Sequence, residues 1–182
     1  MANPIHIKDH GRPLVLRYED FIAYHGGDAL AGAAIGFRAM DYAGGILSQA
    51  EPWDREHLSV TTRHSGPGIR DAIEYVTRCV TRGHFKLDEQ DRSRAALDAF
   101  QFTVSDARQQ VRIALRAGVM PQRFFDLASC LRENREANRE TAREREELDT
   151  LKAAVAQTVM ARSLEELFTL ELASAQQNAI YA

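Results

Sequence analysis

The sequence predicts an α+β fold, in which a small, mainly antiparallel sheet packs on helices and a helical C-terminal region extends the core. Apolar side chains recur at helical spacing over residues 18–47, whereas Leu58–Thr62 alternates apolar and polar residues and is rich in β-branched side chains. Helical spacing returns after Pro121. The chain is therefore expected to divide into an N-terminal arm (1–17), an α+β core (18–120) and a helical extension (121–182).

The N-terminal part predicts an arm followed by one or two helices. Leu14-Val15-Leu16 in the arm indicates a short strand or a docking segment. From Tyr18 to about Leu47 the apolar spacing indicates helix, broken near Gly26-Gly27 and ending at Gly44-Gly45, because glycine is frequent where helices end. Small residues at positions 29, 32, 33 and 36 allow close contact between helices or between copies of the chain.

The middle of the chain predicts strands around a further helix. The strand Leu58–Thr62 leads through a glycine-containing loop, His64–Gly68, into a helix over Ile69–Val76. A loop at the start of a helix can hold an anion, because the first backbone N–H groups have no partner within the helix. Two further strands and the polar turn between them are expected at His84–Leu87, Phe100–Val104 and Asp88–Asp91.

The C-terminal part predicts helices throughout. Ser105-Asp106-Ala107 is expected to cap a helix that carries Val111, Ile113, Ala114 and Leu115 and stops at Gly118. The next helix starts at Pro121, and the interleaved Arg and Glu residues from Arg132 to Glu147 are typical of one exposed helix. Apolar spacing then resumes over Leu151–Leu172. The residues expected to dock on the core are Val155, Val159, Leu164, Leu167 and Phe168.

Composition limits the classes of partner. Hydrophobic residues make up 45% and charged residues 27% of the chain, and 23 basic against 26 acidic side chains give a net charge of −3. A nucleic-acid binder usually carries a basic excess, because phosphate neutralisation supplies most of its affinity. We therefore expect no nucleic-acid partner.

Cysteine usage and hydropathy indicate a soluble, cytoplasmic protein. Cys79 and Cys130 form no CxxC pair, so neither a disulfide framework nor a cysteine zinc cage is expected. The first residues lack the continuous apolar core of a signal peptide, and no apolar run approaches the ~20 residues that span a bilayer. We therefore expect no membrane partner.

The stretch from Tyr24 to Asp28 is the candidate entrance to a site. Gly26 and Gly27 permit a turn that presents the His25 imidazole and the Asp28 carboxylate to a pocket. Other short motifs follow in order. They are Asp71-Ala72-Ile73, Thr77-Arg78-Cys79, Arg82-Gly83-His84, Ala99-Phe100-Gln101-Phe102 and Leu164-Glu165-Glu166-Leu167-Phe168.

This order resembles the family of the formylmethanofuran dehydrogenase E-subunit, over roughly residues 18–116 and again in the tail. In that family a His-Gly-His-x-Cys-Pro-Gly motif opens the first helix, and a Cys-x-x-Asp-Ala-Ile motif follows. His25 matches the first His, whereas Gly27 stands at the second His and Ala29 and Gly68 stand at the two Cys positions. The resemblance implies an α+β core, usually a homodimer, and a role associated with one-carbon or metal-cofactor chemistry. It does not imply formylmethanofuran dehydrogenase activity.

The first functional hypothesis is a pocket for a transition metal or a metal-containing cofactor. His25, His64, Cys79 and His84 carry suitable donors and would line it, with Asp28 nearby. The competing interpretation is that Cys79 is an inert buried thiol and that the histidines pack or cap. If His25 is the sole axial ligand, a haem-like macrocycle fits, because a zinc cage needs about four donors.

The second hypothesis is a pocket for a small organic molecule or for a tetrapyrrole-like or pterin-like cofactor. Its flat apolar contacts would come from Tyr24, Phe37, Tyr42, Trp53 and Phe85, although aromatic residues at helical or strand spacing are mostly core. Polar or anionic groups of the ligand would be fixed by His25, Arg63 and Arg82. The candidate cofactor-binding residues are therefore His25, Asp28, Tyr24, Arg63 and Arg82.

Two further hypotheses remain open. His25 can act as a general base assisted by Asp28, Asp71 or Cys79, although the chain has no GxSxG, HExxH or GxGxxG motif. Alternatively, the charged segment Arg132–Glu147 serves as a dimer arm or docks a partner. The favoured interpretation is a homodimer that binds a metal or a metal-containing cofactor, with an organic-ligand pocket or an interaction module without metal as the alternative.

Overall fold

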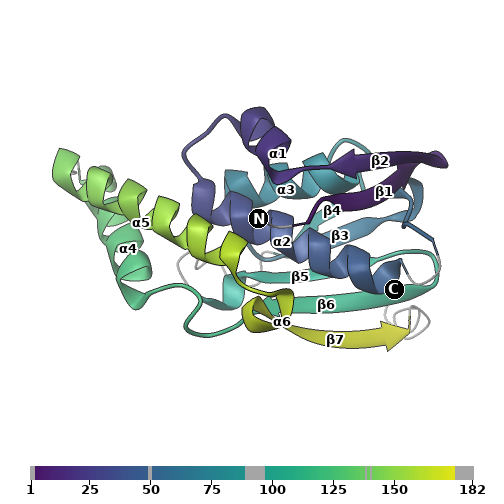
Figure 1. The fold of residues 1–182 in the computed structure, drawn as a ribbon. Coiled ribbons are helices and arrows are strands. Elements are labelled where there is room, and N and C mark those ends of the chain that lie inside the picture. The colour runs from purple at the N-terminus through teal and green to yellow at the C-terminus, as the bar shows by residue number, and fades with distance from the viewer. Residues whose placement is uncertain (1–2, 49–50, 89–96, 138, 140, 175–182) are drawn as a thin grey trace.

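A five-stranded sheet with helices on one face organises the residues that the computed structural model describes, which are 3–48, 51–88, 97–137, 139 and 141–174 (Figure 1). The strand order is β4-β3-β5-β6-β7. β3 and β4 run parallel and the other neighbouring pairs run antiparallel, so the predicted α+β class with a mainly antiparallel sheet is confirmed. The strands are β3 (Ser59–Thr62), β4 (Phe85–Leu87), β5 (Gln101–Ser105), β6 (Gln109–Leu115) and β7 (Phe168–Ser174).

In the view of Figure 1 the helices α1, α2, α3 and α5 lie above β5, β6 and β7, whereas α4 lies to the left of the sheet and α6 at the start of β7. The helix α2 packs between α3 and α5, and α1 packs on α3. Two short 3-10 turns, Arg55–His57 and Leu97–Ala99, precede β3 and β5. The helices are α1 (Tyr18–His25), α2 (Leu30–Leu47), α3 (Pro67–Thr77), α4 (Gln122–Glu136), α5 (Ala142–Ala161) and α6 (Leu164–Leu167).

The predicted N-terminal arm is a β-hairpin. β1 (Ile5–Asp9) pairs antiparallel with β2 (Arg12–Leu16), and the turn between them places His10 and Gly11 at positive φ. Ile5 and Ile7 are buried in the core beside α2. The arm is therefore an anchored part of the fold, and its second strand contains the predicted Leu14–Leu16 segment.

The break between the first two helices lies where the sequence predicts it. Gly26 adopts the left-handed conformation (φ 58°) and its N–H closes the last turn of α1 by donating to the Ile22 carbonyl. The second helix continues past the predicted end at Gly44-Gly45 to Leu47. Gly44 lies against the indole of Trp53, and a Cβ at this position would lie 2.8 Å from the ring.

The small-residue face of α2 contacts α3 of the same chain. A Cβ on Gly36 would lie 2.8 Å from Cβ of Ala72, and one on Gly32 would lie 3.6 Å from the side chain of Ile69. At the start of α3, a Cβ on Gly68 would lie 2.5 Å from the Ala29 carbonyl oxygen. Of the two uses that the sequence left open for this face, the structure shows the interhelix contact.

The helix predicted over residues 105–118 is wrong, because this segment forms β6. Val111, Ile113 and Leu115 alternate with less buried residues, and the buried side chains face the helices. The carboxylate of Asp106 accepts hydrogen bonds from the N–H groups of Arg108 and Gln109, so it shapes the hairpin turn between β5 and β6. Pairing with β5 and β7 on both sides outweighs helical propensity here.

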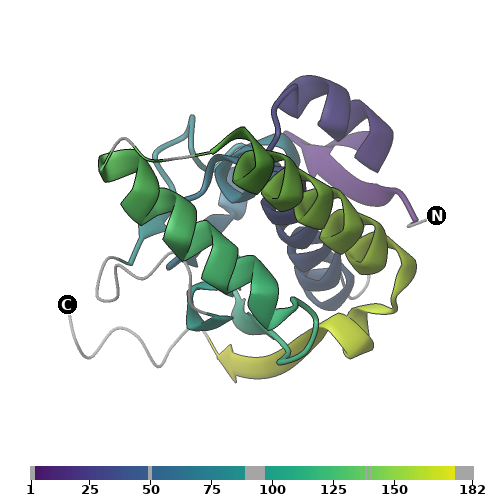
Figure 2. The same cartoon turned by 90° about the vertical axis from the view of Figure 1, so that its left-hand side faces the viewer.

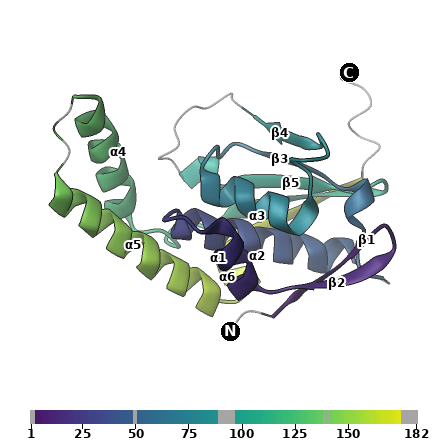
Figure 3. The same ribbon diagram turned by 90° about the horizontal axis from the view of Figure 1, so that it is seen from above.

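The single exposed helix predicted over Arg132–Glu147 is also wrong. The helix α4 ends at Glu136, and a capping box of Thr141 and Glu144 starts α5 as a separate helix. The two helices lie side by side and extend beyond the end of the sheet (Figure 2, Figure 3). The predicted start at Pro121 is confirmed, with Pro121 as the N-cap of α4.

The last described segment is not purely helical, contrary to the expected helical spacing over Leu151–Leu172. After the short helix α6, the chain forms β7 and pairs antiparallel with β6, from Leu115 opposite Phe168 onward. The C-terminal region therefore supplies an edge strand to the same sheet as the core. The predicted turn Asp88–Asp91 lies outside the described residues after Asp88. Within the described ranges, no helix is both long and apolar enough to cross a membrane.

Candidate functional site

A hydrogen bond between two helices is the centre of the candidate site. His25 is the last residue of α1, and its Nδ1 lies 2.7 Å from Oδ2 of Asp71 on α3. The His25 side chain is 3% exposed and that of Asp71 is 36% exposed. An ionised carboxylate can only accept hydrogen bonds, so Nδ1–H donates to Asp71. In the neutral imidazole Nε2 is then the nitrogen with the free lone pair.

The Nε2 atom of His25 is buried and has no hydrogen-bond partner among the described residues. Leaving a buried polar atom unpaired costs on the order of 1–3 kcal/mol. Gly27 closes over this edge of the ring, because a Cβ at Gly27 would lie 3.2 Å from both Nε2 and Cε1. Phe21 flanks the ring, with the two ring centroids 6.1 Å apart. Nε2 of His25 is therefore a buried polar atom that none of the described residues satisfies.

The residues expected beside His25 lie at the surface. Asp28 is 85% exposed, and the Lys152 ammonium lies 3.8 Å from its carboxylate. Tyr24 is 55% exposed and its ring packs near that of Tyr75, at a centroid distance of 5.7 Å. Asp71, not Asp28, is the carboxylate that bonds to His25.

Cys79 and His84 meet at one backbone carbonyl. The thiol of Cys79 donates to the carbonyl of Leu58 at 3.4 Å, and Nδ1 of His84 lies 3.2 Å from the same oxygen. Cys79 is 1% exposed, and this burial raises the pKa of its thiol to about 11. The sulfur is therefore neutral near pH 7, which fits the inert buried thiol.

His64 is engaged in its own loop. Its Nδ1 accepts a hydrogen bond from the Gly66 N–H at 2.9 Å, and its ring lies 4.4 Å from that of Phe100. Among the residues that the structure describes, no three His, Cys, Asp or Glu side chains are placed to hold one metal ion. His25, His64, Cys79 and His84 are consequently not assembled into the single cluster that the sequence led us to expect.

Arg82 joins the N-terminal hairpin to the loop after α3. Its Nη2 donates to Asp9 at 2.7 Å, and Arg55 donates to the other oxygen of Asp9 at 3.3 Å. The Arg82 hydrogen bond is the largest cause that lowers the pKa of Asp9, and the same bond raises the pKa of Arg82. This geometry gives Arg82 a structural role in anchoring β1.

The aromatic residues considered for a flat pocket are distributed through the structure. Phe37 is fully buried and stacks on Phe21 at 5.7 Å. Trp53 lies against Gly44, and the ring centroid of Tyr42 lies 6.3 Å from that of Phe168, where β6 ends and β7 begins. Phe37 and Trp53 are thus core residues.

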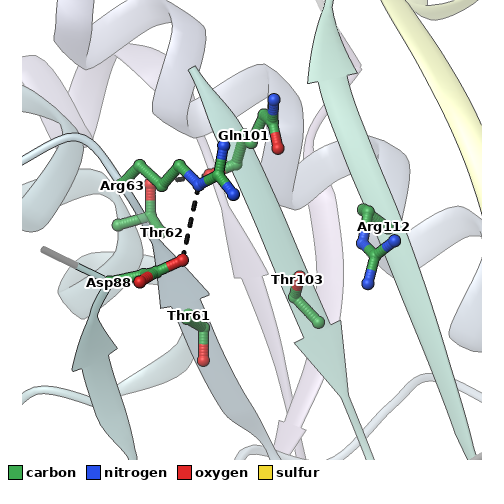
Figure 4. A pocket seen from close by; sticks show the side chains of 7 residues that line it. All are labelled: Thr61, Thr62, Arg63, Asp88, Gln101, Thr103 and Arg112. Atoms are coloured by element: carbon green, nitrogen blue, oxygen red, sulfur yellow. Dashed lines mark hydrogen bonds and ion pairs between the residues drawn. The ribbon is translucent and has the colours of Figure 1, made fainter. Parts of the chain in front are cut away.

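Arg63 lies elsewhere, in a polar cavity of about 230 Å³ on the sheet. Its Nε lies 3.4 Å from Oδ2 of Asp88 (Figure 4). Sequence reasoning named Arg63 but missed the rest of this cavity, whose signal is the alternation of polar and apolar residues along β3, β5 and β6. The lining residues are Thr61, Thr62, Arg63, Asp88, Gln101, Thr103 and Arg112.

Comparison with known proteins gives one family. The sequence model of the family described as FmdE, Molybdenum formylmethanofuran dehydrogenase operon, matches residues 24–169. The matched range includes His25, Asp71 and the start of β7, so it covers the motifs that carry the resemblance in the sequence. No curated protein matches the chain.

Proposed function

The chain belongs to the FmdE family, and from this membership we propose that it binds a metal or a metal-containing cofactor through Nε2 of His25. The observation that carries the proposal is a buried Nε2 without a partner among the described residues, on a ring whose Nδ1 bonds to Asp71. Histidines that ligate metals commonly donate their other N–H to a carboxylate, which fixes the tautomer and orients the ring. His25 and Asp71 have this arrangement.

The metal-donor side chains that remain at the motif positions favour a bound cofactor that needs only one imidazole from the protein. Gly27, Ala29 and Gly68 stand where the family motifs carry His and Cys. Ala29 and Gly68 are in direct contact, since a Cβ on Gly68 would lie 3.2 Å from that of Ala29. The place of the two motif cysteines is thus filled by close packing of α2 on α3. A structural zinc site needs about four protein ligands, whereas a haem-like macrocycle carries its own equatorial donors and accepts a single axial histidine.

Entry to Nε2 runs through the connection between α1 and α2. Gly27 covers the Nε2 edge of His25, and this connection contains no regular secondary structure. A bound group therefore reaches Nε2 when the connection moves aside. Gly26, at φ 58°, is the position where the backbone of this connection turns.

A hemin titration tests the proposal on the full chain. We expect the wild-type protein to shift the Soret band with one-to-one stoichiometry, and His25→Ala to weaken hemin binding by at least about tenfold, as expected for losing an axial ligand bond. His6→Ala is the matched control, because His6 is exposed on β1. Elemental analysis of the freshly purified protein accompanies the titration. Equal binding and equal spectra of the wild type and His25→Ala would contradict the proposal.

A second candidate function rests on the same contact. A histidine that acts as a general base commonly has one ring nitrogen hydrogen-bonded to a carboxylate, while the other nitrogen takes the proton. The His25–Asp71 pair allows the same arrangement. A small organic ligand with an O–H or N–H group would then be the partner of Nε2. This alternative is favoured if the purified protein is colourless and metal-free and leaves the hemin spectrum unchanged.

The proposal includes a homodimer with a role beside one-carbon chemistry. The resemblance to a family of dimers supports the first part, and the family description, which refers to a formylmethanofuran dehydrogenase operon, supports the second. Because α3 covers the small-residue face of α2, the interface of such a dimer uses another surface. Sedimentation equilibrium of the full chain measures the mass, and a monomer at micromolar concentration would contradict this part.

A further inference from the structure

The face of the sheet opposite the helices carries a row of polar residues. Thr61, Thr103 and Arg112 are register partners across β3, β5 and β6. The preceding row, Val60, Val104 and Val111, is buried against the helices. Because side chains alternate between the two faces of a sheet, the polar row points away from the helices.

A second set of polar residues lies beside this row. Arg63 follows β3, Asp88 follows β4 and Gln101 begins β5. Register places them next to one another, and the hydroxyl of Thr62 donates to the Gln101 carbonyl at 2.8 Å. The cavity of about 230 Å³ lies between the two sets, with Arg63 and Arg112 on opposite sides of β5 (Figure 4).

The cavity is rich in hydrogen-bond donors, and its lining residues carry more positive than negative charge. Two guanidinium groups face one carboxylate, that of Asp88, and hydroxyl and amide groups lie between them. Among the described residues, Arg63 engages Asp88 through Nε alone, at 3.4 Å, so its two Nη atoms remain for a ligand. Arg112 pairs with Glu171 at 3.3 Å, but both side chains are more than half exposed, and such pairs are weak.

We propose that this cavity binds a small anionic molecule that carries a carboxylate or phosphate group. The Nη atoms of Arg63 present the planar fork that pairs with two oxygens of such a group. Arg112 faces the ligand from the other side of β5, and Thr61 and Thr103 donate their hydroxyls to further oxygens. The small volume suits a molecule of a few heavy atoms or the anionic end of a larger one.

This site is independent of the His25 site. His25 and Asp71 lie in the helical layer, whereas the polar row lies on the opposite face of the sheet. His25→Ala is therefore expected to leave anion binding unchanged, and the two proposals fail separately.

Titration of the ¹⁵N-labelled full chain tests the anion site. Inorganic phosphate and succinate are added in separate experiments at constant ionic strength, and the amide signals of β3, β5 and β6 and the Nε–Hε signals of arginine are followed. We expect shifts confined to these strands, with Nε–Hε shifts at Arg63 and Arg112. The probe that binds more tightly identifies the anionic group.

Three variants decide the result. We expect Arg63→Gln and Arg112→Gln each to weaken binding by about tenfold, the loss of one charge-assisted hydrogen-bonded contact. Arg63→Lys retains the charge but not the fork, so it is expected to weaken binding as well and serves if Arg63→Gln disturbs folding. Arg12→Gln is the control, because Arg12 is exposed on β2. If neither probe causes localised shifts up to about 10 mM, the proposal is overturned, because binding weaker than this corresponds to negligible affinity. Equal loss in Arg12→Gln and the cavity variants also overturns it.

Discussion

Asp71 on α3 holds the imidazole of His25 at the end of α1, with 2.7 Å between Oδ2 and Nδ1. The contact joins residues 46 positions apart and fixes which ring nitrogen carries the proton. It therefore sets the chemistry available at Nε2 as well as the position of the ring.

Asp71→Asn tests this dependence. An amide can donate to Nδ1, which favours the tautomer with the proton on Nε2 and removes the lone pair that a metal needs. We expect hemin affinity to fall by about 10–100-fold, the usual effect of losing such a partner, with unchanged far-ultraviolet circular dichroism. Asp28→Asn is the matched control, because Asp28 is 85% exposed. Equal losses in the two variants would assign the effect to surface charge.

Close packing of α2 on α3 predicts that replacing two glycines of α2 by alanine changes the unfolding free energy in opposite directions. In Gly36→Ala the new methyl group meets Cβ of Ala72 at 2.8 Å, and we expect a loss of about 1–3 kcal/mol of unfolding free energy. In Gly45→Ala nothing lies within 4 Å, and removal of backbone freedom is expected to stabilise by about 0.5–1 kcal/mol. Urea denaturation measures both. Equal changes in the unfolding free energy of the two variants would show that helix propensity, and not packing, determines the effect.

The Cys79 thiol predicts a loss of stability at alkaline pH. Its pKa rises from 9.0 to about 11 in the folded protein, because burial disfavours the thiolate. Between pH 9 and 11 the folded state holds a proton that the unfolded state has released, so the unfolding free energy falls as pH rises. The contribution is roughly 2 to 3 kcal/mol across this window. Urea denaturation at pH 8, 9, 10 and 11 measures it.

The control for this pH dependence is Cys79→Ala. We expect a flatter profile between pH 9 and 10 in the variant, despite a lower stability overall from the lost packing. Burial also raises the pKa of Tyr18 to about 12, so both proteins lose stability from its titration above pH 10. Parallel profiles of the two proteins between pH 9 and 10 would contradict the prediction.

The capping box at the start of α5 predicts how much unfolding free energy is lost when its hydrogen bonds are removed. The Thr141 side chain accepts from the Glu144 N–H, so Thr141→Ala leaves this N–H without its partner. We expect a loss of about 1 kcal/mol of unfolding free energy. Thr150→Ala, at an exposed position of the same helix, is expected to be neutral or slightly stabilising, because alanine is the better helix former. Thermal denaturation distinguishes the two.

Local signals predict the helices α1, α2 and α3 in the N-terminal half of the fold, although not all of their ends. Gly26 marks the end of α1, because glycine adopts the left-handed conformation without steric cost. The helix α3 begins at Pro67, two residues before the helix predicted from Ile69. The segment 109–115 shows where local signals fail. Val111 and Leu115 are spaced for a helix face, yet Val111, Ile113 and Leu115 also fit one face of a strand. Long-range pairing with β5 and β7 decides between these two.

The same limit applies to the sites. The neighbouring glycines predict His25 as a site residue, but they leave two carboxylates, Asp28 and Asp71, as candidates for its partner, and only the packing of α1 on α3 selects Asp71. The polar cavity was missed because Arg112 was assigned to a helix, which removed it from the neighbourhood of Thr103. Among the described residues His64 belongs to no group of three metal-ligating side chains, and its Nδ1 accepts from the Gly66 N–H of its own loop, neither of which local spacing reveals.

The pairing of β7 with β6 also has a consequence for the order of folding. Phe168 lies opposite Leu115, so this ladder joins segments separated by more than fifty residues of chain. During synthesis β6 leaves the ribosome long before β7 and has an open edge in the meantime. Such edges recruit strands from other molecules. Closure of the sheet is expected to be a slow, late step, because contacts of high sequence separation slow folding. Until it occurs, the unpaired edge of β6 is a place where the nascent chain can pair with other molecules.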